Sequence, residues 1–125
     1  MPNSDEKKKK RVLVVDDETA ILRIIDTSLR LMGYDVITAG SGKDALKLCE
    51  TEKPDIMLLD IFMPGMDGLE VMEILRQKSK MPVIILSANS SSREIALRLG
   101  ADDFVAKPFT PEQMEKRVSA ALEKK

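Results

Sequence analysis

The sequence predicts an α/β fold in which a five-stranded parallel sheet carries helices on both faces. Short apolar runs alternate with stretches of helical periodicity, and several of these runs are apolar at nearly every position. The length of 125 residues suits one domain. Right-handed crossovers leave few topologies for five βα units. We therefore expect the common flavodoxin-like (βα)5 doubly wound arrangement, with strand order 2-1-3-4-5.

The strands are predicted from the short apolar segments. Residues 11–15, 56–60 and 83–86 are almost wholly apolar, as expected for strands that are covered on both faces. The segments 34–38 and 103–106 complete the set of five.

The helices are predicted from apolar residues that recur every three or four positions. The five predicted faces are Ile21, Ile25, Leu29 and Met32; Ala45, Leu46 and Cys49; Val71, Met72 and Leu75; Ile95, Ala96 and Leu99; and Met114, Val118, Ala121 and Leu122. Gly33 and Gly100 stand where two of these helices should end. Ser41 followed by Asp44 resembles a capping box, and Thr110 fits the N-cap of the last helix.

The distribution of charge indicates a basic tail and a mildly acidic body. The chain has 20 basic and 21 acidic residues. Residues 1–10 are polar and aperiodic, so we expect a disordered basic N-terminal tail there and a single domain over residues 11–125. The chain after residue 11 carries 15 basic and 19 acidic residues, which argues against direct nucleic-acid binding.

Residue types that are rare or missing exclude further classes of function. The sequence has no histidine and one cysteine, so we expect no histidine-based catalysis, structural zinc site or internal disulfide. No apolar run approaches the ~20 residues of a membrane span, and the N-terminus lacks the apolar core of a signal peptide. We therefore expect a cytoplasmic protein that does not enter a membrane.

Polar side chains follow the predicted strands at their carboxyl ends. Asp16 and Asp17 follow the first strand, Asp60 ends the third, Ser87 follows the fourth and Lys107 follows the fifth. The carboxyl ends of parallel strands meet at one edge of the sheet, where such folds bind their ligands. We therefore expect these five side chains to converge in one shallow pocket.

The predicted pocket suits phosphoryl transfer. Three neighbouring carboxylates repel one another, and a divalent cation relieves that repulsion. Oxygen ligands without histidine or cysteine favour Mg²⁺, and the Lys107 ammonium adds a permanent counter-charge. A carboxylate in such surroundings can attack phosphorus and form an acyl phosphate.

Each of these residues also has a purely structural explanation. Asp16 and Asp17 could cap the first helix, Asp60 could begin a turn, Ser87 could cap the fourth helix, and Lys107 could be a surface charge. The placement of all five at the ends of strands is much less expected by chance than any single placement. The prediction therefore depends on the combination.

The segments VLVVDDE, DIMLLDIFMPGMDG, IILSA and FVAKPFT resemble the receiver domain of two-component response regulators, such as chemotaxis regulators. The resemblance covers about residues 11–123. It implies a signalling switch rather than an enzyme, which takes a phosphoryl group from a sensor histidine kinase or a histidine phosphotransfer protein. The chain would assist its own phosphorylation and dephosphorylation.

The resemblance implies a role for each acidic residue. Asp60 corresponds to the phosphoacceptor. Asp17, Asp60 and the backbone carbonyl of Phe62 correspond to the Mg²⁺ ligands, and Asp16 is expected to act through a metal-bound water. Phe62 and Asn89 should flank the path of the hydrolytic water, and we expect the bulky Phe62 to slow dephosphorylation.

The resemblance also implies a conformational switch. Lys107 is expected to pair with Asp60 and then with its phosphoryl oxygens, next to a cis bond to Pro108. Phosphorylation adds about two negative charges, which should draw the Ser87 hydroxyl across and open space into which Phe104 turns. The surface of the fourth helix, fifth strand and fifth helix is then the expected output face.

Two other functions remain as alternatives. An aspartate-nucleophile phosphohydrolase also places an aspartate after its first strand, but it usually needs a cap for which this chain has no room. A flavin-binding electron carrier needs a phosphate loop rich in Gly, Ser or Thr, where this chain has Asp16, Asp17 and Glu18. The sequence does not specify the downstream protein or output domain, or a phosphorylation-dependent dimer. We expect a stand-alone regulator.

Overall fold

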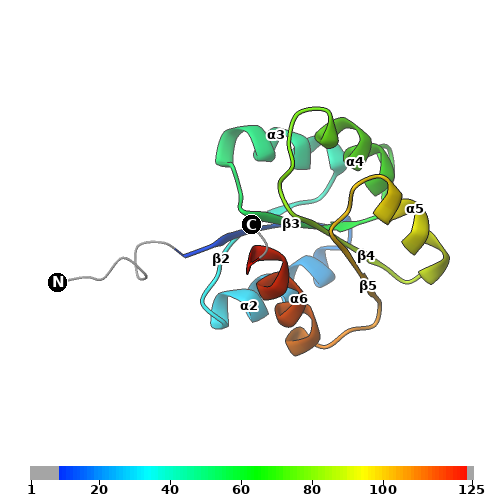
Figure 1. Cartoon of the computed structure of the whole chain (residues 1–125). Coiled ribbons are helices and arrows are strands. Elements are labelled where there is room, and N and C mark those ends of the chain that lie inside the picture. Colours follow the sequence, from blue (N-terminus) through cyan, green and yellow to red (C-terminus); the bar gives the residue numbers. More distant parts are fainter. Residues whose placement is uncertain (1–8, 124–125) are drawn as a thin grey trace.

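The computed structural model describes residues 9–123 and contains one sheet of five parallel strands in the order β2-β1-β3-β4-β5 (Figure 1). The strands are β1 (Arg11–Val15), β2 (Asp35–Ala39), β3 (Ile56–Asp60), β4 (Val83–Ser87) and β5 (Asp103–Ala106). Both the parallel pairing and the order agree with the prediction, so the flavodoxin-like topology is confirmed.

Helices cover both faces of this sheet, as predicted. They are α2 (Thr19–Leu31), α3 (Gly42–Glu52), α4 (Gly68–Arg76), α5 (Arg93–Arg98) and α6 (Pro111–Glu123), with a 3-10 turn η1 (Ser90–Ser92) before α5. Helices α2 and α6 lie on one face, and α3, α4 and α5 lie on the other (Figure 1). Each face therefore has its own apolar core.

The two cores use alternate residues of the same strands. On the α3–α4–α5 side, Leu13, Leu59 and Ile85 pack with Met72 and other buried residues. On the α2–α6 side, Val12, Leu58 and Ile84 pack with residues that include Ile25, Leu29, Met114 and Val118. Strands β3 and β4 are buried at every position. This burial on both faces explains why the central strands read as continuous apolar runs.

Strand β2 begins at Asp35 rather than at the predicted residue 34. The N–H of Tyr34 donates to the Leu29 carbonyl at 3.0 Å, which closes the end of α2. The Tyr34 hydroxyl donates to Glu115 of α6 at 2.8 Å. Tyr34 thus belongs to the helix end and contributes a contact between α2 and α6.

The predicted capping box at Ser41 and Asp44 is only half formed. The Ser41 hydroxyl accepts the Asp44 N–H at 3.2 Å, but the Asp44 side chain does not accept the Ser41 N–H in return. Aspartate is one methylene shorter than the glutamate or glutamine that such a box requires. A complete box forms instead at α4, where Asp67 and Glu70 each accept the other's backbone N–H, at 2.9 and 3.0 Å.

Helix α5 buries less of its predicted apolar face than expected. It has six residues and follows the 3-10 turn directly. Only Ala96 of the predicted face is buried, whereas Ile95 is 48% exposed. Leu99, the third residue of that face, is the C-cap residue just after the helix and is only partly buried.

The tail predicted over residues 1–10 lies outside the described residues, apart from Lys9 and Lys10, which are exposed. Within residues 9–123, no helix is both long and apolar enough to cross a membrane.

Candidate functional site

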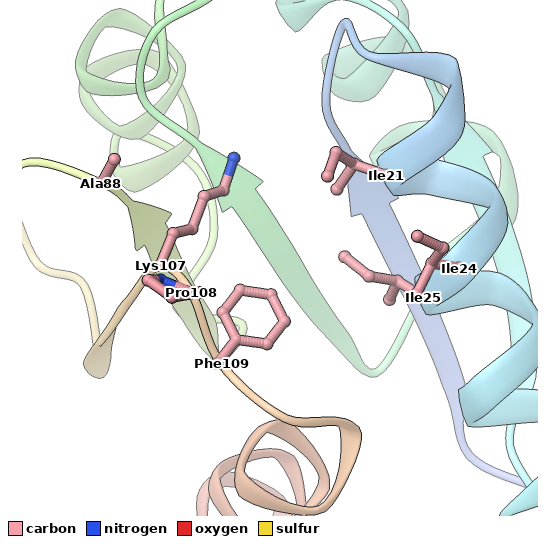
Figure 2. Close-up of a pocket in the computed structure, with 7 residues that line it drawn as sticks. All are labelled: Ile21, Ile24, Ile25, Ala88, Lys107, Pro108 and Phe109. Carbon is pink, nitrogen blue, oxygen red and sulfur yellow. The ribbon is translucent and has the colours of Figure 1, made fainter.

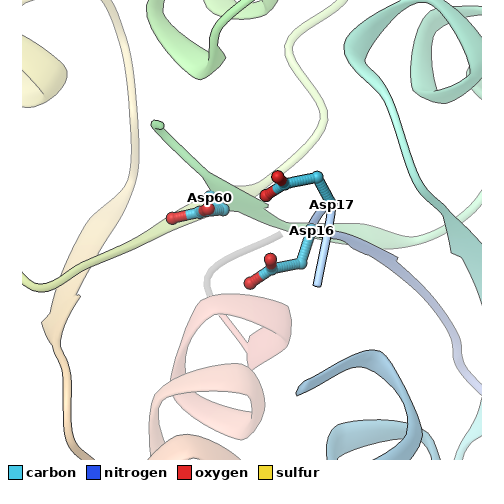
Figure 3. A group of neighbouring side chains, drawn as sticks. All are labelled: Asp16, Asp17 and Asp60. Carbon is cyan, nitrogen blue, oxygen red and sulfur yellow. The ribbon is translucent and has the colours of Figure 1, made fainter. Parts of the chain in front are cut away.

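Three carboxylates meet at the carboxyl edge of the sheet (Figure 3). Asp16 and Asp17 follow β1, and Asp60 is the last residue of the adjacent strand β3. Each offers a carboxylate oxygen, and these oxygens lie within 4.8 Å of one another. Asp16 and Asp60 are buried, and Asp17 is exposed. The structure thus brings together the three acidic residues that the sequence singled out.

Asp16 has a structural role, but it does not cap α2. Its Oδ1 accepts the N–H of Glu18 at 2.9 Å, and its own N–H donates to the Ala39 carbonyl of β2 at 3.1 Å. The N-cap of α2 is Glu18, with no side-chain cap bond. The helix-capping explanation for Asp16 is therefore wrong, and its Oδ2 remains directed to the cluster.

Lys107 brings one positive charge to the three carboxylates. Its Nζ lies 3.2 Å from Asp16 Oδ2 and 3.4 Å from Asp60 Oδ1. We predicted a pair with Asp60, and the structure shares the ammonium between both buried aspartates. The Lys107 N–H donates to the Ser87 carbonyl at 2.9 Å, and the bond to Pro108 is cis. Lys107 is thus anchored to β4 and is not a solvated surface charge.

The ionisation of Asp60 and Lys107 reflects this confinement. Burial raises the pKa of Asp60, the Asp16 carboxylate raises it further, and Lys107 lowers it in part. Burial alone would lower the pKa of Lys107, but the charges of Asp60 and Asp16 outweigh that effect and raise it. Lys107 therefore stays protonated, whereas ionisation of Asp60 is less favourable than that of an exposed aspartate.

Ser87 is the last residue of β4, the strand that neighbours β3, and Asn89 lies in the loop that follows. Ser87 is fully buried, and its Oγ accepts the Asn89 N–H at 3.1 Å. Asn89 caps η1, since its Oδ1 accepts the N–H of Ser91 at 3.0 Å and the Ser91 hydroxyl at 2.6 Å. The Ser87 hydroxyl therefore holds the loop after β4 and does not cap α5.

The two aromatic residues of interest differ in burial. Phe104 of β5 is 3% exposed and belongs to the core on the α5 side. Phe62, in the loop after β3, is 58% exposed. Phe104 therefore already lies inside the protein, whereas Phe62 is exposed two residues after Asp60.

An apolar pocket that the sequence did not reveal adjoins the cluster (Figure 2). Its volume is about 410 Å³, and its lining is Ile21, Ile24, Ile25, Ala88, Lys107, Pro108 and Phe109. The isoleucines of α2 face Phe109 across the pocket. Ile24 is 59% exposed. The only signal for this pocket in the sequence is an apolar residue at position 24, beside the predicted face of its helix.

Several curated proteins with similar sequences are named as transcriptional regulators. The alkaline phosphatase synthesis transcriptional regulatory protein PhoP of Bacillus subtilis (strain 168) is 47% identical over 116 residues, which cover 90% of this chain and 48% of PhoP. The probable transcriptional regulator ycf27 of Porphyridium aerugineum is 45% identical over 116 residues, covering 91% of this chain and 48% of that protein. The chain thus spans about half the length of these relatives.

Solved structures with the same fold cover the whole domain. A putative response regulator from Chloroflexus aurantiacus J-10-fl superposes with a TM-score of 0.89 and 31% identity, over 93% of this chain and 99% of the other. The receiver domain of the Francisella response regulator 1452 gives a TM-score of 0.88 and 36% identity, over 93% and 98% of the two chains. The family model for the response regulator receiver domain matches residues 12–119. The chain therefore belongs to the response regulator receiver domain family.

Proposed function

We propose that this chain is a phosphorylation-controlled switch in which Asp60 accepts the phosphoryl group. The observation that supports this most directly is the surroundings of the Asp60 carboxylate. It lies at the end of a buried strand, within 4.8 Å of carboxylate oxygens of Asp16 and Asp17 and 3.4 Å from the Lys107 ammonium. Such an arrangement suits an anionic nucleophile that attacks an anionic phosphoryl group.

A divalent cation fits the donor set of this cluster. Three carboxylates face one ammonium group, so negative charge is in excess, and every candidate ligand atom is a hard oxygen. Oxygen-only sites of this kind favour Mg²⁺. Asp17, Asp60 and the backbone carbonyl of Phe62 would hold the ion, and Asp16 would act through a bound water. The ion, when bound, would neutralise charge on the carboxylates and on the phosphoryl oxygens.

The transfer is a displacement at phosphorus. A carboxylate oxygen of Asp60 forms the new O–P bond, and the P–N bond to the histidine of the donor breaks, with its electron pair going to nitrogen. The Lys107 ammonium, which now contacts Asp16 and Asp60, then pairs with the phosphoryl oxygens. Hydrolysis by water returns the Asp60 carboxylate and inorganic phosphate, so the chain is a phosphoacceptor and not an enzyme with a separate substrate.

The switch would act through Ser87 and the α5–β5–α6 surface. A phosphoryl group on Asp60 offers acceptor oxygens to the Ser87 hydroxyl, which now holds the Asn89 N–H. Phe104 is already buried, so we propose that phosphorylation stabilises this inward position against an outward one. A structure with a bound phosphoryl mimic, in which Ser87 kept its bond to Asn89, would contradict the switch.

The donor would be a sensor histidine kinase or a histidine phosphotransfer protein, and the output a downstream protein or domain. A donor must reach Asp60 across the carboxyl edge, where the apolar pocket between α2 and Phe109 offers non-polar contact area next to Lys107. The α5–β5–α6 surface is the proposed output side, including any phosphorylation-dependent dimer. The names of the relatives indicate transcriptional control as the output.

Phe62 and Asn89 would set the lifetime of the phosphorylated state. Phe62 is bulky, is 58% exposed and lies two residues after Asp60, so its ring would exclude the attacking water. A Phe62→Asn variant should therefore lose its phosphoryl group faster, as followed by release of inorganic phosphate. An unchanged rate would contradict the proposed role of Phe62.

Intact-protein mass after incubation with acetyl phosphate tests the proposal as a whole. We expect a gain of about 80 Da, one phosphoryl group, in the wild type with Mg²⁺. The gain should be absent without Mg²⁺ and absent in Asp60→Asn. A gain that survived in Asp60→Asn would contradict the assigned phosphoacceptor. Continued turnover of a phosphate ester would favour the phosphohydrolase alternative.

A further inference from the structure

We propose that Gly42 and Gly68 are positioning residues for the phosphoacceptor end of the site. They fix residues 61–67, the segment between β3 and α4 that we call the β3–α4 loop. This loop begins immediately after Asp60 and contains the backbone carbonyl of Phe62. The inference rests on the proposed function, because it concerns how the same carboxylate and carbonyl are held in place.

Gly68 packs directly on the backbone of the phosphoacceptor. A Cβ atom at this position would lie 2.5 Å from the Asp60 carbonyl oxygen and 2.8 Å from Ile61 Cα. The Gly68 N–H donates to the Ile61 carbonyl at 2.8 Å, which ties the two ends of the loop together. The atoms in the way are backbone atoms, so a side chain cannot be accommodated by a change of rotamer.

Neither element beside Gly68 can move away easily. Strand β3 lies between β1 and β4 and is buried at all five positions. Helix α4 is fixed by Val71, Met72 and Leu75, which are between 0 and 2% exposed. Close-packed interiors transmit such strain. A side chain at position 68 would therefore displace the β3–α4 loop and the end of β3, which carry the Phe62 carbonyl and the Asp60 carboxylate.

Gly42 holds the far end of the same loop from a different helix. A Cβ atom at this first residue of α3 would lie 2.7 Å from Val71 Cγ2 and 3.0 Å from the Met66 carbonyl oxygen. Glycine is a poor helix former, so its presence in α3 is explained by this close approach. Helix α3 thus packs against the loop at Met66, and α4 packs against its other end through Gly68.

The middle of the loop is also anchored. Ile61 and Met63 are 2% and 7% exposed and belong to the core on the α3–α4 side. Asp67 and Glu70 form the capping box that starts α4. Phe62 lies between the two buried residues, so its carbonyl has little freedom once both ends of the loop are fixed.

Gly40 provides a matched control in the neighbouring loop. A Cβ atom at Gly40 would meet nothing within 4 Å, and its backbone does not adopt the left-handed conformation. Gly40→Ala therefore applies the same chemical change close to Gly42 without the contact. Gly33 and Gly65 are unsuitable controls because their φ angles are +97° and +78°.

The experiment compares Gly68→Ala, Gly42→Ala and Gly40→Ala with the wild type in three measurements. Circular dichroism and thermal melting report the fold, calorimetric titration with Mg²⁺ reports metal affinity without any reaction, and intact-protein mass reports the rate of phosphoryl uptake from acetyl phosphate. Displacement of reacting groups by about 1 Å reduces rates by up to about a hundredfold. We expect a folded Gly68→Ala protein to lose about tenfold or more in both Mg²⁺ affinity and uptake rate, Gly42→Ala to lose less, and Gly40→Ala to match the wild type.

A folded Gly68→Ala protein with wild-type Mg²⁺ affinity and uptake rate would overturn the inference. If Gly68→Ala does not fold, Gly42→Ala decides in its place, because its closest contact is a side-chain methyl group. A Gly42→Ala protein that melts at a lower temperature but keeps wild-type Mg²⁺ affinity would show a merely structural glycine and would also overturn it. Failure of the proposed function looks different, since the wild type itself would then take up no phosphoryl group, while the Mg²⁺ affinities would still test the positioning role.

Discussion

The two edges of the sheet have similar charged residues and opposite surroundings. At the amino edge, Arg11 meets Asp35 and Glu52 through its side chain, each at 3.0 Å, and Asp55 through its backbone N–H at 2.8 Å. At the carboxyl edge there are again three acidic residues, Asp16, Asp17 and Asp60, and Lys107 contacts two of them, Asp16 and Asp60. The Arg11 and Asp35 side chains are 37% and 40% exposed, whereas the Asp60 side chain is 7% exposed.

Burial, rather than composition, therefore distinguishes a stabilising ion network from a reactive site. Water at the amino edge screens the charges and keeps each interaction weak. At the carboxyl edge, burial raises the pKa of Asp60, and the carboxylates of Asp60 and Asp16 raise the pKa of Lys107 although burial opposes this. Negative charge that the protein alone does not neutralise is available there to attract a cation and to attack phosphorus.

Replacement of Lys107 at the carboxyl edge should have the largest effect on the free energy of unfolding. Lys107→Met leaves Asp16 and Asp60 buried without a counter-charge, so we expect the free energy of unfolding to fall by about 3 kcal/mol without divalent cations. Urea denaturation at neutral pH measures this loss. Added Mg²⁺ should restore part of it. A loss of stability no larger than that of Arg11→Met would contradict the claim that burial makes the two edges differ.

Removal of a carboxylate should change stability in opposite directions at the two edges. Asp60→Asn relieves repulsion in a buried cluster, and we expect a gain of about 1 kcal/mol in the free energy of unfolding without Mg²⁺. Asp35→Asn removes an attractive pair with Arg11 and should cause a small loss. Thermal melting of both variants shows whether each is more or less stable than the wild type. A loss of stability in Asp60→Asn would contradict the proposed repulsion within the buried cluster.

The amino edge should respond weakly to loss of its cation. Arg11→Met removes two exposed ion pairs, so we expect a loss of about 1 kcal/mol in the free energy of unfolding. The difference from the wild type should shrink at about 1 M salt, because exposed charges are screened. A loss that is large and independent of salt would show that this network is more buried than its exposure indicates.

Tyr34, which precedes β2 at the amino edge, tests whether burial has the same effect there. Burial and the bond to Glu115 raise the pKa of Tyr34 to about 12 from the ordinary 10.0. Since Tyr34 is the only tyrosine and tryptophan is absent, ultraviolet absorbance should follow its ionisation alone. The stabilisation should be complete below pH 10.0 and be lost as the pH rises towards 12. Glu115→Gln should lower the midpoint, and a wild-type midpoint near that of the urea-unfolded chain would count against this effect of burial.

Much of the fold followed from patterns that the sequence displays openly. Continuous apolar runs identified β1, β3 and β4 because strands buried on both faces need no polar positions. Errors occurred where local backbone or side-chain hydrogen bonds decide how a helix begins or ends. Tyr34 is drawn to the end of α2 by its bond to the Leu29 carbonyl, and Asp44 is too short to complete a capping box.

The candidate site was predictable in its members but not in its contacts. The ends of parallel strands must meet, so Asp16, Asp60 and Lys107 could be grouped from position alone. The shared bond of Lys107 to both aspartates depends on side-chain conformations that no spacing encodes. The crowding at Gly68 was equally hidden, because it depends on how closely α4 approaches β3.

Titration of isotope-labelled protein with Mg²⁺, followed by amide NMR, is the most direct test that the carboxyl edge is the reactive one, because it observes the acidic residues of both edges at once. We expect saturable shifts at Asp16, Asp17, Asp60 and Phe62, and none at Asp35 or Asp55. Asp60→Asn should weaken the response at the carboxyl edge. Saturable binding at the amino edge, or none at the carboxyl edge, would contradict the claim that burial turns one of two similar sets of charged residues into the reactive site.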